Sequence, residues 1–403
     1  MRVSAWGVTS GAWGAIGPQV DQDDLTRVDR VPGVRSAPPG ATTHTAAAPY
    51  FPSLRSIVMT RVFSGIQPTG QKHIGNYLGA IRHYVADQER YGAEAIFCVV
   101  DLHSMTQPFE PAELTSSTRE TFATLIASGL DPERAIVFVQ SHVHEHAELA
   151  WLFSCVATTG ELSRMVAFKE KSAGRESVSA GLYTYPVLQA ADILLYLADR
   201  VPVGEDQRQH LELARDVARR FNTRYGELFP QPQAAIPPTA ARISDLQEPT
   251  KKMSTSSLSS EDGRLLMLDE PDVIRRKLKR AVTDSEGTIR HDWDAKPGVS
   301  NLLEILHAIS GEEIPALEVR YAGQGYGNFK NDVAEVVVEH LAPIRERHAA
   351  LMADTTELDR LMAIGASRAQ AIAAPVLAEA KARMGLLPSL PASADEFRAV
   401  AES

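Results

Sequence analysis

The sequence predicts an α/β protein with a doubly wound parallel sheet, a helical C-terminal region and a disordered N-terminal leader. From about residue 60, short apolar runs alternate with segments of helical period, which is the pattern of strands joined by helices. Helical patterns dominate after Leu265. The first 58 residues are rich in Pro, Ala and Thr and show no sustained period, so we expect the organised protein to begin near Met59.

The alternating segments define the sheet and place its functional edge. In order, the expected strands and helices are "RVFSGI", "HIGNYLGAIRHYVADQERY", "AEAIFCVVDLHS", "AELTSSTRETFATLIASGL" and "RAIVFVQS". Parallel strands of this kind place a functional site at their carboxyl ends. Residues 145–200 are then expected to be mainly helical, and "DRVPVGEDQ" to be a further strand that enters a helix. We see no internal repeat.

Composition limits the compartment and the partners. The 403 residues carry a formal net charge of −10, which argues against non-specific coating of nucleic acid, and we expect no DNA partner. The two cysteines, Cys98 and Cys155, lie in apolar runs and are expected to be small buried side chains in a reducing compartment. No apolar run approaches the roughly 18 residues of a membrane span. Because "DQDD" also interrupts any signal-peptide pattern, we expect a cytoplasmic protein with no membrane contact.

The stretch "FSGIQPTGQKHIGNYLGAI" predicts a nucleotide-binding loop before a helix. Gly65 and Gly70 have P-loop spacing, but no Gly-Lys-Ser/Thr follows, so that motif fails. The N-terminus of the helix offers free N–H groups to an anion, and Gly75 would let a flat base approach its backbone. His73 and Asn76 would add hydrogen-bond donors. On these four residues alone, simple capping of a helix is the favoured alternative.

The stretch "TKKMSTSSLSS" is either a polar linker or a mobile loop that grips a polyphosphate. With "HIGN" it resembles the paired HIGH and KMSKS signatures of class I aminoacyl-tRNA synthetases. The segments "SGIQPTG", "FKEKSAG", "TYPVLQAADILLY", "VPVGEDQ" and "AVTDSEGTIR" resemble, within that class, the tryptophanyl-tRNA synthetases of the bacterial type. The resemblance runs from about Arg61 to the C-terminal helices.

The resemblance implies a domain organisation and partners. We expect a disordered leader over 1–58, a Rossmann-type catalytic domain with a helical insertion over 59–250, and the KMSTS loop with a helical domain that binds the tRNA anticodon over 251–403. The implied substrates are ATP with Mg²⁺, L-tryptophan and tRNA(Trp). A homodimer is also implied, with the helix around "GELSRM" at its interface. We expect no metal site made by the protein itself.

The helix "YPVLQAAD" is the candidate tryptophan site. Tyr185, Gln189 and Asp192 are spaced i, i+4, i+7 and share one face, although an ordinary amphipathic helix would show the same spacing. An ionised carboxylate only accepts hydrogen bonds, which suits the indole N–H, and the resemblance gives this role to Asp192. Tyr185, Gln189 and Gln207 would hold the ammonium and carboxylate of the amino acid. The family often has Met where Gln189 stands. The remaining residues of the implied tryptophan site are Gln67 and His103.

The resemblance also implies the residues that handle ATP. His73, Asn76, Lys252 and Lys171 would act on the phosphates in catalysis, through charge and positioning and without covalent chemistry. The stretch "FKEKSAG" is expected to place Lys169 and Lys171 in a loop. Adjacent Glu205 and Asp206 point apart and are not expected to be an acid–base pair. The full expected ATP set is Gln67, Pro68, Thr69, His73, Gly75, Asn76, Gly204, Glu205, Asp206, Gln207, Lys252, Met253, Ser254, Thr255 and Ser256.

Thr255 departs from the family pattern, which often has a lysine there. We expect Lys251 or Lys171 to compensate, so that Thr255→Lys would change catalysis by less than about tenfold. Two alternatives stay open: a tyrosyl-tRNA synthetase, which shares the fold and both signatures, and a catalytically weak paralogue that binds tryptophan or RNA for regulation.

Two further clusters have more modest interpretations. "SHVHEHAE" is expected to be a polar loop that caps a helix and not a metal site, since it lacks the HExxH spacing and a cysteine pair. Only His146 within it resembles a family position. The basic run Arg275–Arg280 is expected to be a solvated helix face, and it is also the most plausible place for tRNA phosphate contact.

Overall fold

The computed structural model describes residues 60–174, 177–202, 204, 207–235, 243–254 and 260–388, all within one packed unit that begins at Val58. The expected leader, 1–58, lies outside the described residues. Five parallel strands form one sheet in the order β3-β2-β1-β4-β5. Their bounds are Val62–Ile66 (β1), Ala95–Val99 (β2), Ile136–Val139 (β3), Arg200–Val201 (β4) and Gln233–Ala234 (β5). The doubly wound parallel sheet expected from the sequence is confirmed.

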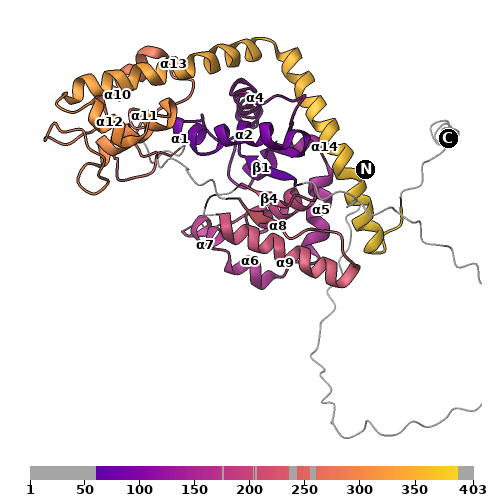
Figure 1. The fold of residues 1–403 in the computed structure, drawn as a ribbon. Helices are drawn as coiled ribbons and strands as arrows, with labels where there is room; N and C mark the ends of the chain where they lie inside the picture. Colours follow the sequence, from indigo (N-terminus) through magenta and orange to yellow (C-terminus); the bar gives the residue numbers. More distant parts are fainter. Residues whose placement is uncertain are drawn as a thin grey trace, which may run out of the picture. The chain divides into compact units, whose positions relative to one another are not determined.

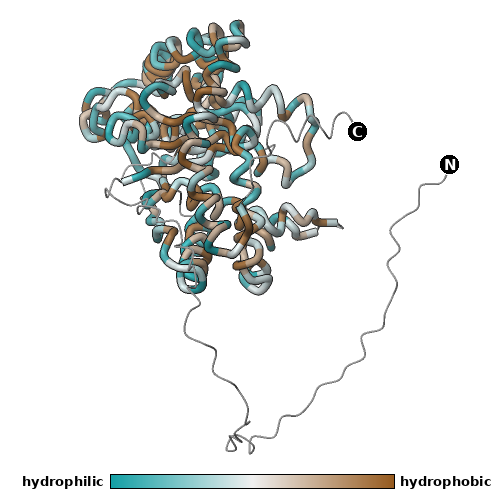
Figure 2. The backbone as a smooth tube through the Cα atoms, turned by 90° about the vertical axis from the view of Figure 1, so that its right-hand side faces the viewer, coloured by the Kyte–Doolittle hydropathy of each residue, from teal (hydrophilic) through white to brown (hydrophobic). Residues whose placement is uncertain are grey.

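The sheet separates two apolar cores, and the alternation of side chains along each strand decides which core a residue enters. Phe97 and Val99 of β2 face one core, while Ile96 and Cys98 face the other. All residues of β2 are buried, as expected for a central strand covered on both faces. In Figure 2 the apolar stretches of the tube lie mainly in the interior of the packed unit.

Helices cover both faces of the sheet (Figure 1). The first core includes α2 (Arg82–Tyr91) and α4 (Pro111–Ala127). The second includes α5 (Glu145–Ser154), α8 (Ala180–Leu194) and α9 (Arg208–Tyr225). Three short helices complete the region between the strands: α3 (Asp101–Ser104), α6 (Thr159–Arg164) and α7 (Val166–Ser172).

The helix that opens with "HIGN" is irregular. A single α-helical turn, α1 (Ile74–Asn76), leads into a π-helical segment, η1 (Tyr77–Ile81), before regular α2 begins. Short π-helical segments occur frequently beside functional sites, because the wider turn displaces the side chains that follow it.

The C-terminal region is helical, as expected. Its elements are α10 (Pro271–Arg280), α11 (Pro297–Ser310), α12 (Ile314–Arg320), α13 (Tyr326–Ala353) and α14 (Thr355–Arg383). Helix α14 returns to the sheet, where it contributes Met362 to one core and Ala373 to the other (Figure 1). It is long and apolar enough to meet the length and composition of a membrane span, and a third of that window is buried inside the protein.

Helix α14 covers the outer edge of β3 at very short range. A Cβ added to Gly365 would lie 1.7 Å from the carbonyl oxygen of Val137, so only glycine fits there. Arg368 donates a hydrogen bond of 2.7 Å to the carbonyl oxygen of Ala135. An uncovered edge strand presents unpaired backbone groups to other chains, and α14 removes that hazard from β3.

Two local expectations are wrong. Cys155 is exposed, because it follows the last turn of α5, whereas Cys98 is buried in β2 as expected. Lys169 and Lys171 lie in α7 and not in a loop, since Phe168 packs edge-to-face on Tyr183 at 5.1 Å and holds that helix against the protein.

The basic run on α10 is largely a solvated helix face, as expected, since Arg275, Arg276, Lys279 and Arg280 are exposed. The exception is Lys277, which is 1% exposed and pairs with Asp269 at 2.7 Å. Arg275 pairs with Glu335, and Arg280 pairs with Asp262. These pairs neutralise much of the charge that the sequence pattern suggested for contact with tRNA phosphates.

Candidate active site

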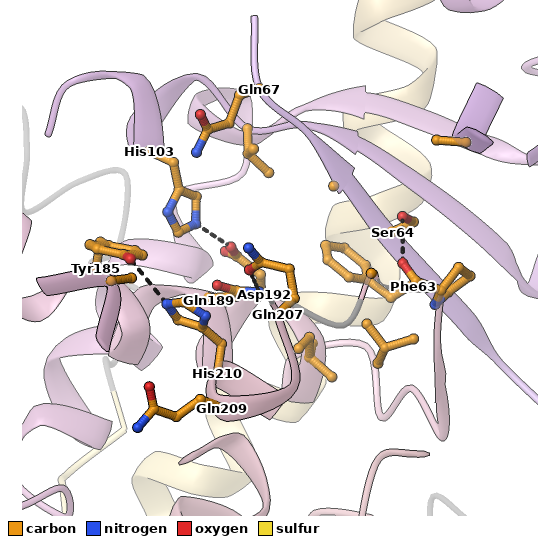
Figure 3. Close-up of a pocket in the computed structure, with 18 of the residues that line it drawn as sticks. Phe63, Ser64, Gln67, His103, Tyr185, Gln189, Asp192, Gln207, Gln209 and His210 are labelled. Atoms are coloured by element: carbon orange, nitrogen blue, oxygen red, sulfur yellow. Dashed lines mark hydrogen bonds and ion pairs between the residues drawn. The ribbon is translucent and has the colours of Figure 1, made fainter. Parts of the chain in front are cut away.

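A cavity of about 960 Å³ opens at the carboxyl ends of β1 and β2, as the fold class predicts (Figure 3). Its volume lies at the upper end of the range for small-molecule sites, which leaves room for an amino acid beside a nucleotide. Eight of the residues predicted from the sequence line it: Gln67, His103, Lys171, Tyr185, Gln189, Asp192, Gly204 and Gln207.

Asp192 is the most tightly held polar group of the cavity. Its side chain is 2% exposed. Gln140 Nε2 donates to Oδ1 at 2.7 Å, and His146 Nδ1 lies 2.7 Å from the same oxygen. His103 Nε2 lies 2.7 Å from Oδ2. Three groups from three separate elements therefore fix the position and orientation of one carboxylate.

The protonation states in this network follow from its partners. Burial opposes ionisation of Asp192, but the hydrogen bonds from His103 and His146 outweigh it and lower its pKa to about 2. Because an ionised carboxylate only accepts, His146 donates through Nδ1, and its Nε2 accepts from the Tyr196 hydroxyl at 2.7 Å. Oδ2 of Asp192 receives one hydrogen bond in this network and can accept a second, from an N–H group inside the cavity.

A second group of side chains borders the carboxylate. The hydroxyl of Tyr185 lies 3.0 Å from Nε2 of buried His210, and burial raises the pKa of Tyr185 (Figure 3). Gln189 Nε2 donates to Gln207 Oε1 at 3.3 Å. Lys171 Nζ lies 5.0 Å from the centre of the Tyr185 ring, so its cation reaches the cavity despite its helical backbone.

His73 combines capping with a free donor. Its Nδ1 accepts from the Asn76 N–H at 3.2 Å, while Asn76 Oδ1 accepts from the His73 N–H at 3.0 Å. Burial lowers the pKa of His73 to about 4, helped by the charges of Lys252, Lys72 and Arg264, so the ring is neutral near pH 7. With Nδ1 acting as acceptor, the proton sits on Nε2, which can donate to an anion. The sequence analysis treated helix capping and ligand binding as alternative roles for His73. In the structure the two roles are compatible, because they use different ring nitrogens.

The segment that carries Lys252 is tied to its neighbours by backbone hydrogen bonds. Asp245 N donates to the Lys251 carbonyl at 2.9 Å, and Met253 N donates to the Ile243 carbonyl at 3.2 Å. The side chain of Met253 is 2% exposed and belongs to the first core, so it does not face solvent. Ser254 is described, but the expected ATP residues Thr255, Ser256, Glu205 and Asp206 lie outside the described residues.

The predicted ATP residues fall into two groups. His73 and Lys252 lie close enough for the lysine charge to lower the histidine pKa, but neither lines the cavity. Pro68, Thr69, Gly75 and Asn76 are also absent from the lining. A Cβ at Gly75 would lie 3.0 Å from the His73 ring and 3.4 Å from Ile243, so a side chain would be crowded at this partly exposed position.

The sequence analysis did not identify three residues of the site: Gln140, Tyr196 and His210. It named a fourth, His146, but assigned it to a polar loop. His146 does not belong to a polar loop; it lies in the first turn of α5 and is fully buried. Gln140 directly follows β3. Because functional sites lie at the carboxyl ends of parallel strands, this position could have identified Gln140 as a candidate site residue.

The comparisons with known proteins agree with this geometry. Residues 58–342 match the family model of class I tRNA synthetases (W and Y). A parallel sheet with a cavity at the carboxyl ends of its strands, in a chain that matches this family model, is that of a class I aminoacyl-tRNA synthetase. The chain belongs to the tryptophan branch of that family, the tryptophan–tRNA ligases.

The similarity extends over most of the chain. It is 53% identical to the tryptophan–tRNA ligase of Caldanaerobacter subterraneus subsp. tengcongensis, covering 82% of this chain and 99% of that one. It is 51% identical to the ligase of Mycobacterium leprae, covering 82% and 97%.

Solved structures give the same result. The tryptophanyl-tRNA synthetase of Mycoplasma pneumoniae has a TM-score of 0.73 at 36% identity, over 82% of this chain and 98% of that one. The enzyme of Campylobacter jejuni, solved with ADP and tryptophan, has a TM-score of 0.71 at 32% identity, over 81% and 100%.

Proposed function

We propose that this protein is a tryptophan–tRNA ligase. The carboxylate of L-tryptophan attacks the α-phosphate of ATP, which gives tryptophanyl-adenylate and releases pyrophosphate. The 3′-terminal ribose of tRNA(Trp) then takes the acyl group. The observation that carries this proposal is the ionised Asp192 carboxylate, held by three hydrogen-bonded side chains in the wall of a cavity of about 960 Å³.

Asp192 would select tryptophan through the indole N–H. A hydrogen bond to a charged group contributes about 1.5–3 kcal/mol. A phenylalanine ring has no such donor and would also remove water from the carboxylate without replacing its hydrogen bonds, a strong basis for rejection. Tyr185, Gln189 and Gln207 border the same space, and we propose that they hold the ammonium and carboxylate of the amino acid. Gln67 and His103 would complete the tryptophan site.

The phosphates would be handled by His73, Asn76, Lys252 and Lys171. The neutral His73 ring has a donor at Nε2, and the Asn76 side chain keeps its NH₂ group because only its oxygen serves the cap. Of the two lysines expected to compensate for Thr255, Lys171 lines the cavity and Lys251 does not. We therefore assign the compensation to Lys171.

ATP is expected to arrive with Mg²⁺. Among the described residues, no group of three His, Cys, Asp or Glu side chains could hold a metal ion. Mg²⁺ commonly binds substrate phosphates and keeps several waters, so we propose that the phosphate oxygens hold it. It would neutralise charge on the leaving pyrophosphate. We also propose a cytoplasmic location, where ATP and tRNA occur together.

The test is tryptophan-dependent ATP–pyrophosphate exchange on the purified protein, with tyrosine and phenylalanine in parallel. Exchange with tryptophan alone supports the ligase. Exchange with tyrosine would favour the tyrosyl-tRNA synthetase. Tryptophan binding without exchange would favour a regulatory paralogue.

We further propose a homodimer through the region around α6. Trp151 on α5 is 69% exposed and Val166 on α7 is 54% exposed, and these two large apolar side chains flank α6 in the sequence. Burying them against a second copy would remove apolar surface from water. Trp151→Glu should shift the protein toward monomer in light scattering. A wild-type protein that is monomeric at micromolar concentration would contradict the proposal.

A further inference from the structure

Lys72 lies inside the loop that precedes the HIGN helix, and neither the fold nor the proposed chemistry accounts for it. The side chain is 7% exposed, which is unusual for a lysine. Its ammonium donates to three backbone carbonyl oxygens of the same loop: Gln67 at 2.8 Å, and Thr69 and Gly70 at 3.2 Å each. An ammonium group has three N–H donors, so these carbonyls use its full capacity.

This arrangement fixes which way the peptide groups of the loop point. In a trans peptide the N–H points away from the carbonyl of the same unit. Because the carbonyls of Thr69 and Gly70 turn inward to Lys72, the N–H groups of Gly70 and Gln71 turn outward. Both residues are exposed, and within the described part of the chain neither N–H has an acceptor. Gly70 has a φ of +61°, the left-handed conformation found in anion-binding turns of the backbone.

The charge of Lys72 is retained near neutral pH. Burial lowers its pKa to about 8, and Glu120 on α4 opposes that shift, so the ammonium form still predominates at pH 7. The carbonyl of Lys72 also accepts from Met267 N at 2.9 Å, and the next residue is His73. The lysine therefore links the loop to the segment that carries the phosphate-facing histidine.

We propose that Lys72 is a positioning residue for ATP: its ammonium gathers the loop carbonyls so that the Gly70 and Gln71 amides face a phosphate oxygen of the nucleotide. This inference rests on the proposed ligase activity. Lys72 itself does not touch the substrate. Without its charge, three converging carbonyls would lose their common donor, and the loop would leave the conformation that presents the two amides.

The test compares Lys72→Met, which removes every donor, with Lys72→Arg, which restores a cation. In pyrophosphate exchange, Lys72→Met should raise KM for ATP at least about tenfold and leave KM for tryptophan within about twofold, while Lys72→Arg should recover part of the loss. Arg90→Met removes one positive charge from an exposed position on α2 and should change neither KM. If Lys72→Met does not fold, Lys72→Gln, which keeps two donors, carries the same comparison.

A second readout needs no catalysis. NMR order parameters of the ligand-free protein should be lower at the Gly70 and Gln71 amides in Lys72→Met than in the wild type, because the loop loses its common donor. Unchanged order parameters in the loop, or an unchanged KM for ATP, would overturn the inference. A wild-type protein without tryptophan-dependent pyrophosphate exchange would instead overturn the proposed function, while lower order parameters in the variant would still support the structural role of Lys72.

Discussion

The two ends of the candidate active site are built in different ways. At the end that we propose binds tryptophan, Asp192, His103, His146 and Gln140 are all buried, and the last three each form a hydrogen bond with Asp192. At the phosphate end, His73 and Lys252 come from segments joined by a few backbone hydrogen bonds around residues 243–245 and 265–267. The exposed loop Gln67–Gln71 and the Lys252 segment both present polar groups outward.

This difference reflects two kinds of recognition. One N–H on an apolar ring is recognised by a single acceptor whose position must be fixed before the ligand arrives. A triphosphate changes its charge distribution as the reaction proceeds, so it is served by donors from several segments. Substitutions at the tryptophan end should therefore affect stability and selectivity together, while those at the phosphate end should act mainly on catalysis.

The largest effect is expected from Asp192→Asn. The new NH₂ group would face the donors of His103, His146 or Gln140, and the indole N–H would lose its charged acceptor. We expect kcat/KM for tryptophan to fall at least about 100-fold, together with a lower melting temperature. Pyrophosphate exchange and thermal unfolding measure the two effects. Asp359→Asn, which breaks an exposed pair with Arg119, is the control and should change neither.

His73→Ala should rank next and separates the two roles of this residue. Loss of the Nε2 donor should lower kcat about 100-fold, and loss of the cap should cost about 1 kcal/mol of unfolding free energy. His73→Asn should restore the cap but not kcat, because Asn caps helices well and has a shorter side chain. Asp354→Ala removes the N-cap of α14 and should cost similar stability without changing kcat. Full activity of His73→Ala would contradict the catalytic role and show that this histidine serves only as a helix cap.

Gly365→Ala should produce a smaller, purely structural effect at the tryptophan end. Its Cβ would meet the Val137 carbonyl at 1.7 Å, so α14 must move away from β3, the strand that leads to Gln140. We expect a loss of about 2–3 kcal/mol in chemical denaturation. Gly327→Ala near the start of α13, where no atom lies within 4 Å, is the matched control and should be neutral or slightly stabilising. If Gly365→Ala and Gly327→Ala changed the unfolding free energy equally, the close approach of α14 to β3 would be contradicted.

The smallest effect is a pH dependence of stability that comes from His73. Its pKa in the folded protein, about 4, lies below its unfolded value of 6.5, so the unfolded chain binds more protons between these values. The contribution is complete above pH 6.5 and is lost as the pH falls toward 4. From pH 7 to pH 5 the wild type should lose about 2 kcal/mol more than His73→Asn in denaturant titrations. Parallel pH profiles would contradict the low pKa.

The sequence was sufficient for the sheet and for the shared face of three residues that line the cavity. Tyr185, Gln189 and Asp192 lie within eight residues on one helix, so their common face follows from helical period. The hydrogen bonds that hold Asp192 could not be predicted in the same way. Gln140 and His146 come from chain segments about 50 residues away, and only the packing of β3 and α5 against α8 brings them near.

For the end that we propose binds the phosphates, the sequence showed the motifs but not their geometry. The "HIGN" and "KMSTS" motifs could be recognised in the sequence. Their geometry, however, depends on long-range backbone hydrogen bonds, such as that from Ile74 N to the Leu265 carbonyl. Lys72 looked like an ordinary polar residue, since nothing in the sequence indicates that its ammonium turns inward to carbonyls of its own loop.

The cover that α14 provides for β3 has a consequence for biosynthesis. Strand β3 is synthesised more than 200 residues before the helix that shields its edge. A nascent chain that has not yet released residues 355–383 from the ribosome would expose that edge and the apolar side chains of α5 beside it. Final closure of the fold is therefore delayed until α14 has left the ribosome. Premature termination before α14 would leave an aggregation-prone product, recognisable to chaperones and proteases, and not a partly active enzyme.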